Sequence, residues 1–141
     1  MSLADNKLVG RRFFEDMLAK GDWAIAEKLM SQDIVMHHPS SPTPVNGREA
    51  VVGFLKAFRA GFPDLKMVAE DVFGEGNKVA VRWRASGTHE AELFGIPPTG
   101  KSMNVAGISI LRIVDGKIVE DWVSEDSLGL MQQLGIIPAM G

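Results

Sequence analysis

The sequence contains no cysteine and no tyrosine. Without cysteine there can be no disulfide, no thiolate nucleophile and no cysteine-based metal site. No apolar run approaches the roughly 18 residues that a membrane-spanning helix needs. A net charge of −3, with the 15 Lys and Arg residues scattered along the chain, gives no basic surface of the kind that binds nucleic acid. We therefore expect a cytoplasmic protein that binds neither nucleic acid nor membranes.

The remaining composition is that of an ordinary globular protein. Hydrophobic residues make up 45% of the 141 residues and charged residues 23%. A chain of this length can bury one substantial core, and no repeat, linker or low-complexity segment divides it. The sequence therefore predicts a single domain, residues 1–141.

Hydrophobic periodicity divides the chain into helices followed by strands. Helical spacing of apolar residues predicts helices over 4–19, about 23–30 and about 47–60. Alternating or apolar segments predict strands over 33–39, 65–73, 78–89, 102–114 and 117–126. The strand 65–73 breaks phase near Asp71. This order is typical of an α+β fold in which long antiparallel strands curl around the helices and leave an apolar pocket.

Asp126 is the first candidate for catalysis, at the end of the strand that begins after Gly116. Strict alternation along this strand puts Asp126 on the same face as the Trp122 indole. A carboxylate among apolar side chains resists ionisation and can act as a general acid or base near neutral pH. Asp126 also precedes a predicted helix, for which aspartate is a favoured N-cap. The two roles are compatible.

Two histidines are further candidates. His89 continues the apolar face of its strand beyond Trp83, which makes it a candidate pocket residue or, alternatively, a hydrogen-bonded histidine at a strand end. His38 shares its parity with Ile34 and Met36, which favours His38 rather than His37 as the inward-facing side chain.

The motif content favours acid–base chemistry over other classes. His38, His89 and Asp126 could converge, but no local metal-ligand motif accompanies them, so we expect no metal. The chain has no Gly-x-Ser-x-Gly nucleophile motif and no phosphate-binding loop, so we expect no nucleotide or other cofactor. The expected ligand is a small hydrophobic organic molecule. The expected pocket walls include Phe54, Phe58, Trp83, Met103 and Trp122.

Two C-terminal motifs resemble a known family. These are Gly87-Thr88-His89 followed by Phe94–Lys101, and Asp115–Trp122 followed by Asp126. Together they resemble the SnoaL-like polyketide cyclases, also called the ester cyclase family, of the nuclear-transport-factor-like α+β superfamily. The resemblance implies a cone-shaped α+β barrel, in which a strongly curved antiparallel sheet wraps around three N-terminal helices and encloses an apolar pocket.

The resemblance also implies a reaction. In the characterised cyclases a strand-end aspartate acts as acid/base without metal or cofactor, and the enolate that it forms closes a ring by intramolecular aldol addition. By position this aspartate matches Asp126, with His89 as its partner or a substrate contact and His38 as the pocket histidine. The fold also hosts other acid–base reactions (isomerase, lyase, hydrolase). A non-catalytic small-molecule binding protein of the same fold is the alternative.

Two surface features complete the prediction. The strand around Ile108–Val114 is apolar on both faces, so we expect a homodimer that covers the outer face. Glu90-Ala91-Glu92 adds two negative charges near the expected mouth of the site, which disfavours acidic substrates.

Overall fold

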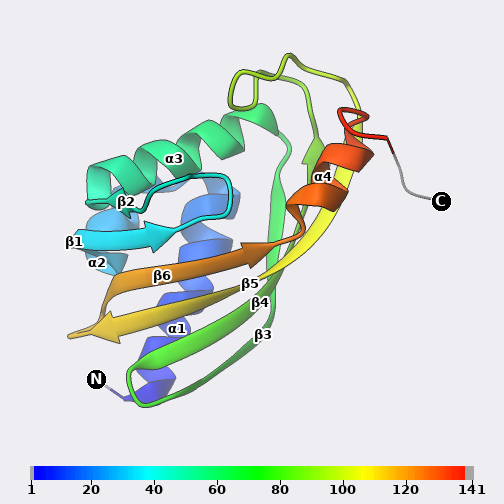
Figure 1. The fold of residues 1–141 in the computed structure, drawn as a ribbon. Coiled ribbons are helices and arrows are strands. Elements are labelled where there is room, and N and C mark those ends of the chain that lie inside the picture. Colours follow the sequence, from blue (N-terminus) through cyan, green and yellow to red (C-terminus); the bar gives the residue numbers. More distant parts are fainter. Residues whose placement is uncertain (1, 139–141) are drawn as a thin grey trace.

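The computed structural model describes residues 2–138 and has one six-stranded sheet with helices on its concave side (Figure 1). The helices are α1 Leu3–Arg12, a π-helical continuation Phe13–Leu18, a 3-10 turn Trp23–Ile25, α2 Ala26–Leu29, α3 Arg48–Gly61 and α4 Ser127–Gln133. The strands are β1 Met30–His37, β2 Val45–Asn46, β3 Lys66–Glu75, β4 Lys78–Thr88, β5 Ser102–Val114 and β6 Lys117–Glu125. The predicted α+β fold is confirmed.

The sheet differs in two respects from a closed antiparallel barrel. Its strand order is β2-β1-β6-β5-β4-β3, so β2 and β3 are free edges and the sheet is open. β1 pairs in parallel with β6, whereas the other pairs are antiparallel. The parallel pair arises because β1 enters the sheet after the N-terminal helices, beside the last strand rather than beside its neighbour in sequence. The sheet is therefore mixed and curved, with α1 and α3 in its hollow (Figure 1).

The N-terminal helix changes its winding where it reaches the interior. From Phe13 to Leu18 the helix is π-helical, and Phe13, Phe14, Met17 and Leu18 are all buried. The wider turn presents these side chains inward together, including the consecutive Phe13 and Phe14. Single π-turns of this kind are frequent at functional sites.

A tight turn and a bulge set the register of the last hairpin. Asp115 and Gly116 both have positive φ, 50° and 77°, as a two-residue type I′ hairpin requires. On β6, Ile118 pairs with Ile113 and Glu120 pairs with Arg112, so Val119 is an extra residue without a partner. This β-bulge reverses which side chains face the core from Glu120 onward.

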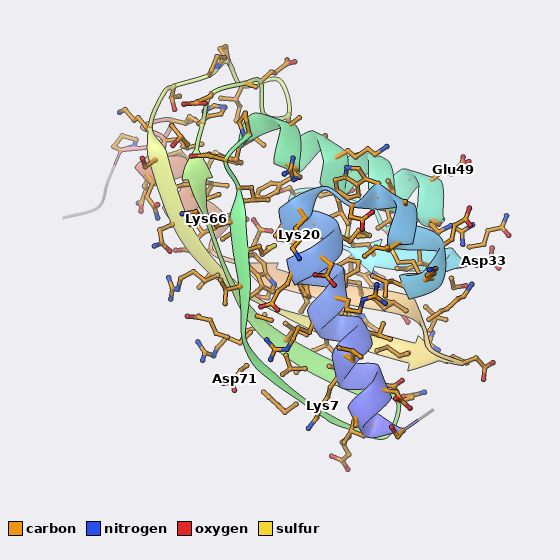
Figure 2. The ribbon with its side chains drawn as sticks, turned by 180° about the vertical axis from the view of Figure 1, so that it is seen from behind. Lys7, Lys20, Asp33, Glu49, Lys66 and Asp71 are labelled. Atoms are coloured by element: carbon orange, nitrogen blue, oxygen red, sulfur yellow. The ribbon has the colours of Figure 1, made fainter. Side chains whose placement is uncertain are left out.

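Most charged side chains lie on the surface. The labelled Lys7, Lys20, Asp33, Glu49, Lys66 and Asp71 lie on the surface of the molecule (Figure 2). The buried core is apolar, with only Asn6, His89, Ser109 and Asp121 as buried polar residues within 2–138. No helix in the described part of the chain is long and apolar enough to cross a membrane.

Candidate active site

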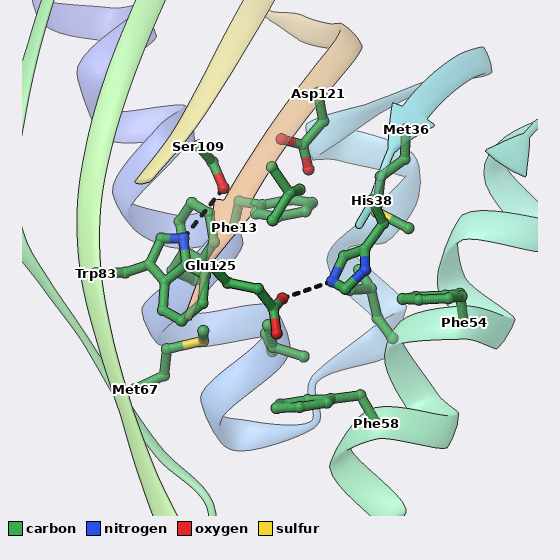
Figure 3. Close-up of a pocket in the computed structure, with 14 residues that line it drawn as sticks. Phe13, Met36, His38, Phe54, Phe58, Met67, Trp83, Ser109, Asp121 and Glu125 are labelled. Carbon is green, nitrogen blue, oxygen red and sulfur yellow. Dashed lines mark hydrogen bonds and ion pairs between the residues drawn. The ribbon is translucent and has the colours of Figure 1, made fainter. Parts of the chain in front are cut away.

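A narrow, mainly apolar cavity lies between the concave face of the sheet and the helices (Figure 3). The cavity volume is about 30 Å³, and the free space counted out into the opening to solvent is about 420 Å³. The lining residues come from the π-helical segment, α3 and strands β1, β3, β4, β5 and β6. They are Phe13, Phe14, Leu18, Met36, His38, Phe54, Leu55, Phe58, Met67, Trp83, Ser109, Asp121, Val123 and Glu125.

Asp121 is the carboxyl group that lies deepest in this cavity. Because of the bulge at Val119, Asp121 faces inward together with Val123 and Glu125. The residue is only 1% exposed, and its Oδ1 atom is buried without a hydrogen-bond partner among the described residues. Removal of the carboxyl group from water, with no compensating partner, raises the pKa of Asp121 to about 7. It can therefore both hold and release a proton near neutral pH.

Ser109 on β5 is the nearest hydroxyl group on the same face. It pairs in register with Val123, and so lies diagonally across from both Asp121 and Glu125. The Trp83 indole Nε1–H donates a hydrogen bond to Ser109 Oγ at 3.1 Å. Gly107 makes this contact possible, because a Cβ atom at Gly107 would collide with the Trp83 ring. Ser109 accepts this bond and keeps its own proton free to donate.

His38 and Glu125 form a second polar group in the cavity wall. His38 Nε2 lies 2.7 Å from Glu125 Oε1, and the two side chains are 9% and 8% exposed. The Ser40 backbone N–H donates to His38 Nδ1 at 3.0 Å. The His38 ring also packs against Phe54, with ring centroids 4.7 Å apart.

Asp126 lies outside the cavity, at the exposed N-terminus of α4. Its side chain accepts a hydrogen bond from the Gly129 backbone N–H at 2.9 Å, which is the N-cap geometry. The Asp126 carboxylate lies where a Cβ atom at position 129 would stand, so glycine there leaves room for the cap. Asp126 therefore occupies the capping position, and its catalytic role stays a prediction without support from the cavity.

His89 is fully buried at the end of β4 but does not line the cavity. The Thr99 backbone N–H donates to its Nδ1 at 3.2 Å, and its ring packs against Phe62 at 5.7 Å between centroids. The His89 backbone N–H donates to the Lys101 carbonyl and the Gly100 N–H donates to the His89 carbonyl, and these two bonds close the base of the loop 90–101. His89 thus stabilises this loop, and the structure does not bring it together with Asp126.

The other predicted wall residues divide into two groups. Phe54, Phe58 and Trp83 line the cavity. Met103 is buried in the core away from it, and Trp122 lies on the outer face, stacked on His37 with ring centroids 5.8 Å apart. Strict alternation predicts that Trp122 faces inward, and this prediction is wrong because the Val119 bulge breaks the alternation.

Three polar residues of the cavity are not among the site residues predicted from the sequence: Asp121, Ser109 and Glu125. Each of the three is a polar residue on the inward face of a long strand. The alternation of β5 from Met103 to Ile113 could have revealed Ser109. Asp121 and Glu125 were hidden by the bulge, which no residue type in Lys117–Glu125 indicates. Within the described residues no group of three or more His, Cys, Asp or Glu side chains is arranged to hold a metal ion.

Comparison with known proteins identifies the class. Residues 9–134 match the SnoaL-like polyketide cyclase family, and the chain belongs to that family. A proposed SnoaL-like polyketide cyclase from Jannaschia sp. CCS1 has the same fold, with a TM-score of 0.87 and 27% identity over 96% of this chain and 94% of that one.

Two curated relatives from Streptomyces have names that specify a substrate. The aklanonic acid methyl ester cyclase DauD of Streptomyces sp. (strain C5) is 30% identical over 114 residues, 79% of this chain and 67% of that protein. The aklanonic acid methyl ester cyclase DnrD of Streptomyces peucetius is 32% identical over 102 residues, 70% of this chain and 66% of that protein. The chain thus spans about two thirds of the length of these relatives.

Proposed function

We propose that this chain is a cofactor-independent cyclase that closes a ring in a small hydrophobic ester by acid–base catalysis. The observation that supports this best is Asp121, a buried carboxyl in an apolar cavity whose pKa is raised to about 7 by burial. Such a group is suited to remove a proton from carbon and then return it. The family match and the two relatives support the same class of reaction.

The proposed reaction transfers one proton and returns it. The Asp121 carboxylate removes a proton from the carbon between two carbonyl groups, which leaves an enolate and a protonated Asp121. The enolate carbon then attacks a ketone carbon of the same molecule, forming the new C–C bond and an alkoxide. The alkoxide takes the proton back from Asp121, so the carboxylate is regenerated and no other reactant is needed.

Ser109 is the proposed donor to the enolate oxygen. Its oxygen accepts the Trp83 indole N–H, which fixes the hydroxyl and polarises its proton toward an acceptor in the cavity. A donor placed before the reaction stabilises negative charge that develops in the transition state.

Replacing Ser109 by alanine is expected to lower kcat about tenfold, the value of one net hydrogen bond, with a smaller change in KM. The enolate exists only after proton removal, so the lost bond acts on the transition state more than on substrate binding. Steady-state kinetics of a proton-exchange or cyclisation assay would measure this. Ser109→Thr, which keeps the hydroxyl, should recover activity; equal loss in both variants would contradict the role.

The charge of the cavity favours a neutral substrate. Among the described residues that line it, none is lysine or arginine, whereas two carboxyl groups are present. A substrate carboxylate would therefore be buried without a cationic partner, which is strongly unfavourable. An ester meets this requirement. The names of both relatives specify a methyl ester, which is consistent with the same preference.

A test that needs no knowledge of the natural substrate is α-proton exchange. Ethyl 2-methylacetoacetate carries one acidic C–H between two carbonyl groups, and its loss in D₂O can be followed by proton NMR. The wild-type chain should accelerate this exchange above the buffer rate. Binding of the ester without any acceleration would instead favour the small-molecule binding protein of the same fold.

The outer face of the sheet carries an apolar row that supports a homodimer. Phe73, Ala80, Ile110 and Trp122 are register partners across β3, β4, β5 and β6. Phe73 and Ile110 are 59% and 42% exposed, and Ile108 beside them is 48% exposed. An apolar patch of adjacent strands that no helix covers is typical of an interface between copies.

Replacing Ile110 by lysine is expected to convert the dimer to a monomer, because it would bury two like charges near the centre of the interface. Size-exclusion chromatography with light scattering would give the mass of both proteins. Lys117→Ala, outside the apolar row on the exposed end of β6, is the control and should remain dimeric. A wild-type monomer at all concentrations would rule out the dimer.

A further inference from the structure

The cavity contains a second carboxyl group for which the proposed reaction has no use. Glu125 lies four residues beyond Asp121 on the same strand face, so their Cα atoms are roughly 13 Å apart along β6. The Glu125 side chain is 8% exposed and lines the cavity (Figure 3). A carboxylate at such a position is rare unless it is paired or binds something.

His38 accounts for only one of the two Glu125 oxygens. The Ser40 N–H donates to His38 Nδ1, and a nitrogen that accepts a hydrogen bond carries no proton. The proton of the neutral imidazole is therefore on Nε2, which lies 2.7 Å from Glu125 Oε1. His38 Nε2 is thus the ring nitrogen that contacts Glu125, and this contact positions the carboxylate.

The remaining oxygen, Oε2, is the available acceptor. Within residues 2–138 it receives no hydrogen bond, and in Figure 3 the carboxylate directs one oxygen to His38 and the other into the cavity. Asp121 also has an oxygen without a hydrogen-bond partner among the described residues, and that oxygen is fully buried. Two acceptors thus face one cavity from positions four residues apart, with the Val123 side chain and the Ser109 hydroxyl between them.

We propose that Glu125, held by His38, accepts a hydrogen bond from a hydroxyl group of the substrate and thereby selects it. This inference rests on the proposed function, since it takes the reacting carbon to lie at Asp121. The substrate class is then a neutral, largely apolar molecule with its acidic C–H at one end and a phenolic or alcoholic hydroxyl at the other. A hydroxyl group fits better than an ammonium group, because the apolar walls would not compensate the desolvation of a cation.

Phenol and toluene provide a test, because they have nearly the same shape and differ in one hydroxyl group. Binding can be followed by NMR of ¹³C-labelled methionine methyl groups, since Met36 and Met67 line the cavity and report on it directly. The measured quantity is the Kd for toluene divided by the Kd for phenol. A hydrogen bond to a charged acceptor is expected to make this ratio at least about tenfold higher in the wild type than in Glu125→Leu.

Two matched variants separate Glu125 from the rest of the cavity. Val123→Ala changes a lining residue between the two carboxyl groups, and should shift both affinities together and leave the ratio unchanged. Asp121→Asn should also keep the ratio, although it loses proton exchange. If the wild-type protein shows no proton exchange but its toluene-to-phenol Kd ratio still exceeds that of Glu125→Leu, the proposed function fails and the hydroxyl site stands. If the protein shows exchange but the two ratios are equal, only the hydroxyl site is rejected.

Several outcomes would overturn the inference. One is a ratio that is the same within twofold in the wild type and Glu125→Leu. Another is a wild-type preference for benzylamine, a cation at neutral pH, over phenol that disappears in Glu125→Leu, which would assign an ammonium instead. If Glu125→Leu does not fold, Glu125→Gln keeps the shape with a weaker, neutral acceptor, and the ratio should fall about threefold. An unchanged ratio there also rejects the site.

Discussion

Replacing Asp121 by asparagine is expected to lower the rate of α-proton exchange by about 10²- to 10⁴-fold, the usual contribution of a positioned acid or base. Asparagine has nearly the same shape and cannot accept a proton from carbon at neutral pH. The Asp121 side chain is only 1% exposed and most of the cavity lining is apolar, which disfavours a water molecule taking over its role. Exchange of ethyl 2-methylacetoacetate, corrected for the buffer rate, is the measurement, with circular dichroism to verify folding.

Asp126→Asn is the matched control for Asp121→Asn. The sequence pattern and the family resemblance assign the base to Asp126, whereas the cavity favours Asp121. Asparagine is as good an N-cap as aspartate, so the α4 cap is retained in Asp126→Asn. Loss of exchange in Asp126→Asn with full activity in Asp121→Asn would reverse the assignment.

The pH dependence of exchange should follow the ionisation of Asp121. Only the carboxylate can remove a proton from carbon, and burial raises the pKa of Asp121 to about 7. The value of kcat/KM should therefore increase as pH rises through about 7 and level off above it. A plateau already reached near pH 5 would mean that the base is a solvated carboxylate, such as an exposed capping residue.

Much of the fold follows from local signals in the sequence. The alternation of β4 and β5 and the Asp115-Gly116 turn set two long antiparallel pairs, and helical periodicity identified α1 and α3. The phase break near Asp71 corresponds to the register shift between Ala69 and Asp71. The parallel pairing of β1 with β6 has no such signal, because it depends on where the N-terminal helices place β1.

The candidate site was harder to predict because one inserted residue in β6 exchanges the faces to which the following side chains point. Alternation without the bulge at Val119 places Trp122 and Asp126 inward and Asp121 outward, the opposite of the structure. A bulge in the middle of an apolar strand is decided by pairing with Arg112 and Ile113 and by packing, not by its own residue type. The parity of β1 is undisturbed at its end, and His38 there lies in the cavity.

The same burial that suits Asp121 for catalysis should destabilise the fold as pH rises. In the unfolded chain its pKa has the ordinary value of 3.8, and in the folded chain it is about 7. Below pH 3.8 both states hold the proton, so folding is not opposed. Between 3.8 and 7 the unfolded chain releases the proton and the folded chain keeps it, which favours unfolding increasingly. Above 7 both states are ionised and the effect is constant.

Relative to Asp121→Asn, the free energy of unfolding of the wild-type chain is therefore expected to fall between about pH 4 and pH 7, by up to roughly 4 kcal/mol. Urea denaturation of both proteins across pH 4 to 8.5 would measure the difference, and subtraction removes the titration of all other groups. Asparagine carries no charge, so its stability contains no Asp121 contribution at any pH. A difference that does not vary with pH would show that the Asp121 carboxyl is hydrated in the folded chain. A fall in this difference as pH rises would show that the fold loses stability in the same pH range in which Asp121 becomes an active base. The reason is that proton removal needs the negative charge on Asp121 that the apolar cavity disfavours.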